Sequence, residues 1–160
     1  MRRVVTVGVY GFTAESFLAA LDSAGVVLLL DVRQRRGVRG PQYAWANSAR
    51  LQRALAEAGI GYRHVKGLAP TTELRQLQYR EDDRQGVGKR NRVALAPEYA
   101  ERYTEEILDR FDLRALAESL PDGTTALLCV ERDPEACHRS LVAGRLGARH
   151  GLPVAHLRPG

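Results

Sequence analysis

The residues with the clearest chemical potential lie in one stretch, residues 128–139, which reads L-C-V-E-R-D-P-E-A-C-H-R. The Asp-Pro pair at 133–134 predicts the start of a helix, because the carboxylate caps the first turn and proline fits its opening position. Cys137, His138 and Arg139 would then lie in the first turns. A thiol near a helix N-terminus and beside cations has a lowered pKa and is a better nucleophile. Cys137 is therefore a candidate nucleophile, and packing in the core is the alternative.

A metal site is the other chemistry that cysteine and histidine suggest. Cys129, Cys137 and His138 could supply three ligands, with His64 or His156 as a fourth. The paired thiols separated by only a few residues that are typical of zinc sites are absent from the sequence. Neighbouring residues on a helix also point about 100° apart, so Cys137 and His138 would not share an ion. We therefore predict neither a metal nor a cofactor.

Two carboxylates follow predicted strands. Asp31 ends the second strand and Glu131 follows the fourth. Because ligands of open parallel sheets bind outside the carboxyl ends of the strands, the two carboxylates could serve there as general acid and base. An ion pair between Asp31 and Arg33 is the structural alternative.

Other polar residues at the same strand ends are predicted to contact a ligand. The predicted ligand-binding residues are Tyr10, Arg33, His64, Lys66, Cys129, His138 and Arg139. Arginine and lysine suit an anion, and the free N–H groups of a helix start beside Arg139 would add to the same seat. A structural His64, a packed Cys129 and a solvated Lys66 are the alternatives.

Positive charge is concentrated in two arginine-rich stretches, residues 33–39 and 75–92, the second with Tyr79 among its arginines. The chain carries a net charge of +5, and only two of its 24 basic residues are lysines. If both stretches flank one cleft, they form a basic collar suited to a nucleotide or a nucleic acid. Solvated charged faces are the alternative.

The order of predicted elements positions these residues. Continuous apolar runs predict buried strands, and amphipathic stretches bounded by glycine or proline predict helices. The strands are expected at 4–9, 26–32, 60–65, 125–130 and 153–157, and the helices at 14–24, 44–58, 98–119 and 134–150. This alternation predicts a single α/β domain over residues 1–160, with a doubly wound, mostly parallel sheet flanked by helices as in Rossmann and flavodoxin-like folds. A long basic loop is expected at about 67–95, unless it hides a short helix near 73–80.

The bulk composition excludes several classes. With 160 residues, 44% hydrophobic and 27% charged, the chain suits one globular domain rather than a disordered segment. It contains no run long and apolar enough to span a membrane and no signal-peptide pattern, so we expect a cytoplasmic protein. Two cysteines are too few for a disulfide scaffold. The phosphate-binding motifs G-x4-G-K-[ST] and G-x-G-x-x-G are absent, which disfavours ATP hydrolysis and dinucleotide binding.

These motifs together resemble the bacterial domain of unknown function DUF488. The residues that carry the resemblance are V-G-V-Y-G at 7–11, L-L-D-V-R at 29–33, G-I-G-Y-R-H at 59–64, the cysteine-bearing segment at 128–139 and V-A-H-L at 154–157. The resemblance covers nearly the whole chain and implies a small cytoplasmic α/β protein, but no particular reaction.

The leading functional hypothesis is an enzyme that acts on a phosphate-bearing or nucleobase-containing substrate. Arg33, Lys66 and Arg139 would hold the anion, Asp31 and Glu131 would transfer protons or orient the substrate, and Cys137 would be the nucleophile. The rival hypothesis is a non-catalytic nucleic-acid-binding module with structural cysteines. The sequence favours no particular oligomeric state.

Overall fold

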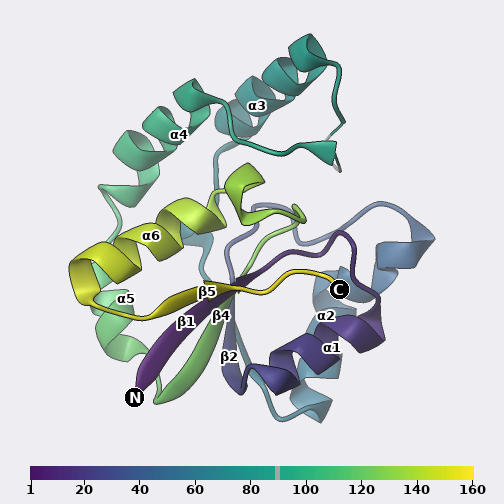
Figure 1. Ribbon diagram of the computed structural model, residues 1–160, viewed down its shortest axis with the longest axis vertical. Helices are drawn as coiled ribbons and strands as arrows, with labels where there is room; N and C mark the ends of the chain where they lie inside the picture. The colour runs from purple at the N-terminus through teal and green to yellow at the C-terminus, as the bar shows by residue number, and fades with distance from the viewer. Residues whose placement is uncertain (89–90) are drawn as a thin grey trace.

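The computed structural model describes residues 1–88 and 91–160 and contains a five-stranded, all-parallel sheet in the order β3-β2-β4-β1-β5 (Figure 1). The strands are β1 (Arg2–Val7), β2 (Val26–Asp31), β3 (Gly61–His64), β4 (Gly123–Leu128) and β5 (Val154–His156). All five predicted strands are present. The predicted fold class, a doubly wound α/β sheet, is confirmed.

One face of the sheet is covered by α1 (Ala14–Ser23), the 3-10 helix η1 (Pro41–Ala46) and α2 (Ser48–Glu57) (Figure 1). Thr13 caps α1 as predicted, because its side chain accepts a hydrogen bond from the backbone N–H of Ser16. The apolar side chains of this layer form one continuous core with alternate residues of the strands, such as Ala126 and Leu128 of β4. The sheet is therefore buried on this side.

The opposite face carries the other helices of the described residues. They are η2 (Lys66–Leu68), α3 (Thr72–Gln85), α4 (Pro97–Tyr103), the π-helical turn η4 (Thr104–Leu108), α5 (Leu113–Ser119), the 3-10 turn η5 (Pro134–Ala136) and α6 (Arg139–His150). A second core lies between them and the sheet, and it includes both Cys129 and Cys137. The strands are thus buried on both faces, which explains their continuous apolar sequences.

Three predictions about this layer need correction. The expected loop at 67–95 contains α3, which extends well beyond the short helix considered at 73–80. The single helix expected at 98–119 is instead α4, η4 and α5, because the chain changes to π-helical geometry at Thr104 and Asp112 caps a new helix. The helix expected at 134–150 is broken at Cys137.

The break at Cys137 separates η5 from α6. Its backbone is extended, with φ −140° and ψ 147°, and the α-helix starts only at Arg139. The side chain of Asp133 makes no capping hydrogen bond. Cys137 therefore does not sit in the first turn of an α-helix, and the predicted seat of free helical N–H groups around it is wrong.

The connections leave the sheet in opposite directions after two adjacent strands, β2 and β4. The chain leaves β2 for the layer of α2, whereas it leaves β4 for the layer of α6 (Figure 1). Such a point in a parallel sheet opens a crevice beyond the strand ends. No helix in the described ranges, 1–88 and 91–160, is long and apolar enough to cross a membrane.

Candidate functional site

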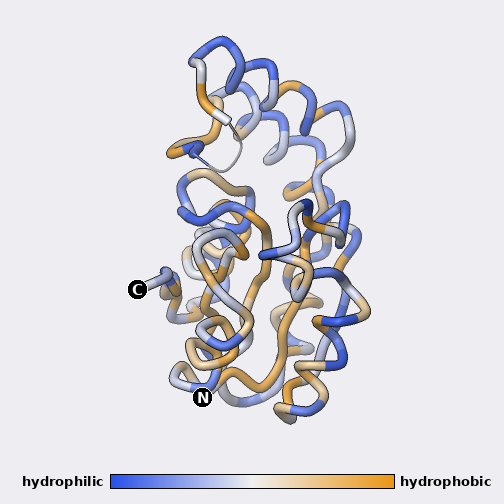
Figure 2. The backbone as a smooth tube through the Cα atoms, turned by 90° about the vertical axis from the view of Figure 1, so that its right-hand side faces the viewer, coloured by the Kyte–Doolittle hydropathy of each residue, from blue (hydrophilic) through white to orange (hydrophobic). Residues whose placement is uncertain are grey.

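A cleft of about 640 Å³ opens at the carboxyl ends of β2 and β4. Five of the predicted site residues line it: Tyr10, Arg33, Cys129, Glu131 and His138. They come from the connections after β1, β2 and β4, so segments far apart in sequence meet here, as the strand-end argument requires. The hydrophilic α3, at the top of Figure 1 and blue in Figure 2, provides the opposite wall with Arg75, Gln78 and Tyr79.

The other five predicted site residues do not line this cleft; they are Asp31, His64, Lys66, Cys137 and Arg139. Asp31 is fully buried, and its carboxylate accepts two hydrogen bonds from the guanidinium of Arg33, at 2.9 Å from Nε and 2.8 Å from Nη2, and a third from the backbone N–H of Arg33 at 3.2 Å. Tyr62 donates a further hydrogen bond of 2.6 Å to the same carboxylate. The structural alternative for Asp31 and Arg33, an ion pair, is what the structure contains.

Arg139 supports the loop after β4 from below. Its side chain is fully buried and donates hydrogen bonds to the carbonyl oxygens of Glu131, at 2.6 Å, and Arg132, at 3.2 Å. These hydrogen bonds therefore fix the backbone that carries Glu131. His64 contacts the carbonyl of Arg33 through Nε2 at 3.0 Å, and Lys66 is exposed on η2 outside the cleft.

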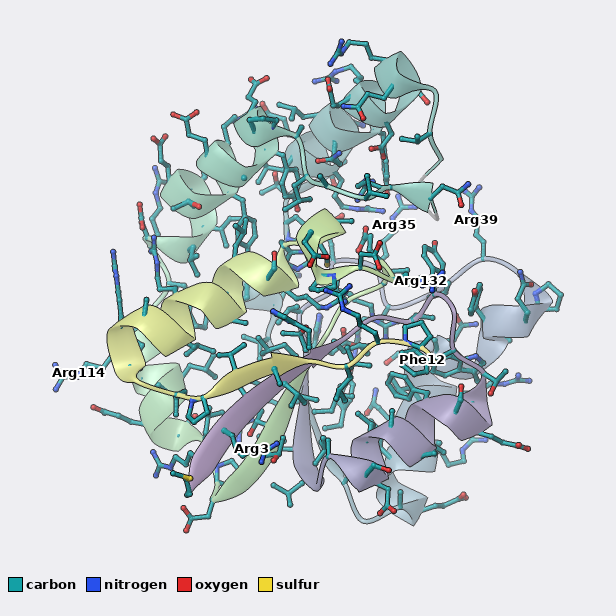
Figure 3. All side chains as sticks on the ribbon, in the orientation of Figure 1. Arg3, Phe12, Arg35, Arg39, Arg114 and Arg132 are labelled. Carbon is teal, nitrogen blue, oxygen red and sulfur yellow. The ribbon has the colours of Figure 1, made fainter. Side chains whose placement is uncertain are left out.

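Arginines from both basic stretches meet around the cleft. Arg33, Arg35 and Arg39 come from the first stretch, and Arg75 and Arg92 from the second. Arg35 and Arg39 lie on the side of the sheet that faces α3 (Figure 3). The predicted collar is thus smaller than the stretches themselves: Arg36 instead contacts Tyr62 and Arg84 pairs with Glu81 on α3, while Lys89 and Arg90 lie outside the described residues.

The arginines of the cleft differ in how their charge is balanced. Arg33 is neutralised by Asp31, and Arg92 by Asp82 and Glu131. Arg75 binds neutral groups, the side-chain oxygen of Gln34 at 2.6 Å and the hydroxyl of Tyr79 at 2.9 Å. In the part of the chain that the structure describes, exposed Arg35 has no hydrogen-bond or ion-pair partner. Positive charge therefore remains available at the rim.

Arg92 is a key residue that the sequence analysis counted only as one of many arginines. It is 7% exposed and binds Asp82 on α3 through both Nε and Nη2, the shortest contact being 2.6 Å. Its Nη1 donates to Glu131 at 3.0 Å and to the carbonyl of Ala136 at 3.3 Å. Arg92 thus connects α3, the loop after β4 and η5. No sequence signal distinguishes it from the other arginines of this stretch.

Three ligand-type atoms converge at and just beneath the floor of the cleft. Nδ1 of His138 lies 3.6 Å from Sγ of Cys129 and 3.6 Å from Sγ of Cys137, and all three side chains are buried. Nε2 of His138 lies 2.8 Å from the carbonyl oxygen of Val32. Because a carbonyl can only accept, Nε2 carries the hydrogen, and the ring therefore presents Nδ1 to the two sulfurs. Cys129 in turn donates to Glu131 Oε2 at 3.3 Å.

The two thiols have opposite acidities. Burial raises the pKa of Cys129, and the neighbouring Cys137 raises it further. Burial also opposes ionisation of Cys137, but the contact with Cys129 and the charge of His138 outweigh it and hold the pKa of Cys137 well below the ordinary thiol value. Burial likewise opposes protonation of His138, yet the charge of Cys137 raises its pKa. The electrostatics favour a thiolate–imidazolium pair of Cys137 and His138.

The fold and the cleft together define a doubly wound α/β protein with a polar crevice at its topological switch point. The model of the domain of unknown function DUF488 matches residues 13–146, so the chain belongs to the DUF488 family, as the sequence motifs predicted. Comparisons with curated proteins and with solved structures gave no match.

Proposed function

We propose that this protein is an enzyme that acts on a small phosphate-bearing substrate, such as a nucleotide, bound in the cleft beyond β2 and β4. The observation that carries the proposal is the pairing of an arginine rim with a floor of Glu131, Cys129 and His138 in one cavity. Its volume of about 640 Å³ falls within the range that encloses a small ligand.

Arg35 and Arg75 are the proposed phosphate contacts. An exposed guanidinium can form two parallel hydrogen bonds with a phosphate, and Arg75 is already oriented by Gln34 and Tyr79. The guanidinium of Arg75 also lies 5.6 Å from the centre of the Tyr79 ring. The ring of Tyr79, which lines the cleft, is a surface on which a nucleobase could stack.

Glu131 is the proposed proton-transfer group, in preference to Asp31, because it lines the cleft and Asp31 does not. Cys137 is 1% exposed and lies outside the lining, so its sulfur does not reach a bound substrate. We therefore do not retain Cys137 as the nucleophile. Free thiols at both cysteines suit a reducing compartment, and we propose that the protein acts in the cytoplasm.

The binding step is tested by calorimetry with a nucleoside monophosphate and with the corresponding nucleoside. We expect the phosphate to be required, and Arg35→Ala to weaken binding about 10-fold through loss of a charge-assisted hydrogen bond. Arg114→Ala is the matched control, because Arg114 is an exposed arginine on α5, away from the cleft (Figure 3). Equal binding of nucleoside and nucleotide would refute the proposed phosphate contact.

The catalytic step is tested with Glu131→Gln. This variant keeps the size of the side chain and the Arg92–Asp82 ion pair, so the nucleotide should still bind. If Glu131→Gln still binds the nucleotide but no longer converts it to product, the proposed enzymatic function is supported. If the unaltered chain binds nucleotides or single-stranded nucleic acid but converts none of them to product, the enzymatic proposal is overturned. That result would support the rival hypothesis, a non-catalytic nucleic-acid-binding module.

A further inference from the structure

We propose that Cys129, Cys137 and His138 form a binding site for a divalent metal ion, Zn²⁺ in the first instance, at the floor of the cleft. Two sulfurs and one imidazole nitrogen lie within 4.8 Å of one another, and the three residues are buried. Thiolate and imidazole are the ligands that zinc prefers in proteins. The site differs from the sequence expectation, in which no metal was predicted.

The two distances from the histidine nitrogen to the sulfurs match a tetrahedral zinc site. Metal–ligand bonds of about 2.3 Å to sulfur and about 2.0 Å to nitrogen place tetrahedral sulfur and nitrogen ligands about 3.5 Å apart. The separation from Nδ1 of His138 is 3.6 Å for the sulfur of Cys129 and 3.6 Å for that of Cys137. An ion would therefore need only small side-chain adjustments to bind all three atoms.

Cys137 and His138 are not consecutive residues of an α-helix, the arrangement in which their side chains would point about 100° apart. Cys137 is extended and His138 precedes the first turn of α6, so their side chains can turn toward a common point. Cys129 directly follows β4 and Cys137 directly follows η5, so the loop between them brings the two cysteines together although they are eight residues apart in sequence. The two cysteines are farther apart in sequence than in typical zinc motifs, but their sulfurs lie near the same histidine nitrogen in the folded chain.

The surrounding backbone orients the ligands. The carbonyl of Val32, at the end of β2, accepts from Nε2 of His138 at 2.8 Å, which leaves Nδ1 for the metal. Such a hydrogen bond to the second ring nitrogen is typical of metal-binding histidines. The backbone N–H of Cys129 is held by the carbonyl of Val7 at 3.2 Å. Cys129 and His138 are thus anchored to the ends of neighbouring strands.

Charge balance also favours a divalent ion. Two thiolates and one neutral imidazole carry a charge of −2, which Zn²⁺ neutralises, and a neutral cluster is far less costly to bury than separate charges. Within the described residues the cluster supplies three protein ligands, the number typical of catalytic zinc sites, whereas structural sites usually have four. The fourth position would be open to water or substrate.

The open position would face the cleft. Cys129 and His138 line the cleft while Cys137 lies behind them, and Glu131 lines it beside Cys129. This role of the ion rests on the proposed function: a bound water next to a carboxylate and an arginine rim would suit a phosphate-bearing substrate. Metal binding itself requires no substrate, so a failure of either proposal can be recognised separately.

The test is titration of the reduced, metal-free protein with Co²⁺, followed by displacement with Zn²⁺. We expect about one equivalent to bind per chain, with a thiolate-to-cobalt charge-transfer band and the intense visible bands of tetrahedral Co²⁺. Cys137→Ser, Cys129→Ser and His138→Ala should each abolish or strongly reduce the charge-transfer band. His150→Ala, at the far end of α6, is the matched control and should leave the spectrum unchanged.

A second measurement covers variants that fail to fold. In the unaltered chain, Zn²⁺ should slow alkylation of both cysteines at least 10-fold, and a chelator should restore the rate. Equal alkylation with and without Zn²⁺, or Co²⁺ bands that persist in folded Cys137→Ser, would overturn the metal site. Neither result would change the outcome of the nucleotide-binding test, so the two proposals can fail independently.

Discussion

At the scale of single residues, the side chain of Arg92 connects helix α3 to the floor of the cleft. It shares its guanidinium between Asp82 on α3 and Glu131 after β4, with all three side chains less than one-tenth exposed. A buried charge network of this kind adds little net stability compared with apolar packing, but removing one partner leaves buried charges uncompensated. The penalty for disrupting it should therefore be large.

We predict that Arg92→Met lowers the free energy of unfolding by about 3–5 kcal/mol, because Asp82 and Glu131 lose their shared counter-ion. Urea denaturation followed by circular dichroism measures the change. Arg102→Met is the matched control: Arg102 also pairs with two carboxylates, Glu73 and Glu106, but it is more exposed, so the loss of unfolding free energy should be much smaller than for Arg92→Met. Similar losses in the two variants would contradict a buried network.

At the scale of elements, the close approach of the loops after β1 and β4 depends on Gly8. A Cβ atom at this position would lie 1.9 Å from the carbonyl oxygen of Glu131 and 3.0 Å from Nη1 of Arg139. Because the nearest atom belongs to the backbone, the loop that carries Glu131 would have to move. Gly8 therefore helps to set the position of the cleft floor.

We predict that Gly8→Ala destabilises the protein by about 3 kcal/mol and also weakens nucleotide binding, because it displaces the Glu131 loop. Gly144→Ala on α6 is the matched control. Apart from its chain neighbours and the backbone of its own helix, no atom lies within 4 Å of the added Cβ, so the substitution should stabilise the helix by about 0.5–1 kcal/mol. Thermal unfolding of the two variants gives the comparison, and an unchanged melting temperature for Gly8→Ala would exclude the clash.

The elements that the sequence predicts well are those that the core determines. Strands such as 26–32 are continuous apolar runs, and α1 has both a cap at Thr13 and an apolar face. Helix α3 was expected as a loop because it is mostly polar; it buries few apolar side chains and covers the cleft. The break at Cys137 has no signature in the sequence, since an Asp-Pro pair also begins longer helices.

The candidate site was predictable only as far as strand ends determine it. Glu131 and Cys129 follow β4 directly, so topology alone carries them to the cleft. Asp31 occupies an equivalent position, but a neighbouring guanidinium, Arg33, turns its carboxylate into the interior. Which of two partners a charged side chain selects depends on distances that a linear pattern does not encode.

At the scale of the whole molecule, the +5 charge and the arginine rim make binding dependent on ionic strength. Raising the salt concentration from about 0.1 M to about 1 M shortens the Debye length from about 10 Å to about 3 Å. We predict that the affinity for a nucleoside monophosphate falls several-fold over this range, as measured by calorimetry. A nucleic acid making about six phosphate contacts would instead lose about 1,000-fold or more over a narrower range, so the slope separates the two ligands.

The order of the sheet has a consequence for dissecting the chain. The segment matched by the family model starts at residue 13 and ends at residue 146, yet β1 lies between β4 and β5 and pairs with both. A fragment trimmed to the matched segment would expose the hydrogen-bonding groups of β4, a buried strand whose last three residues, Ala126, Leu127 and Leu128, are apolar. Such an unprotected edge invites pairing between molecules and aggregation. The first dozen residues are thus integral to the folding unit, although they lie outside its recognisable signature.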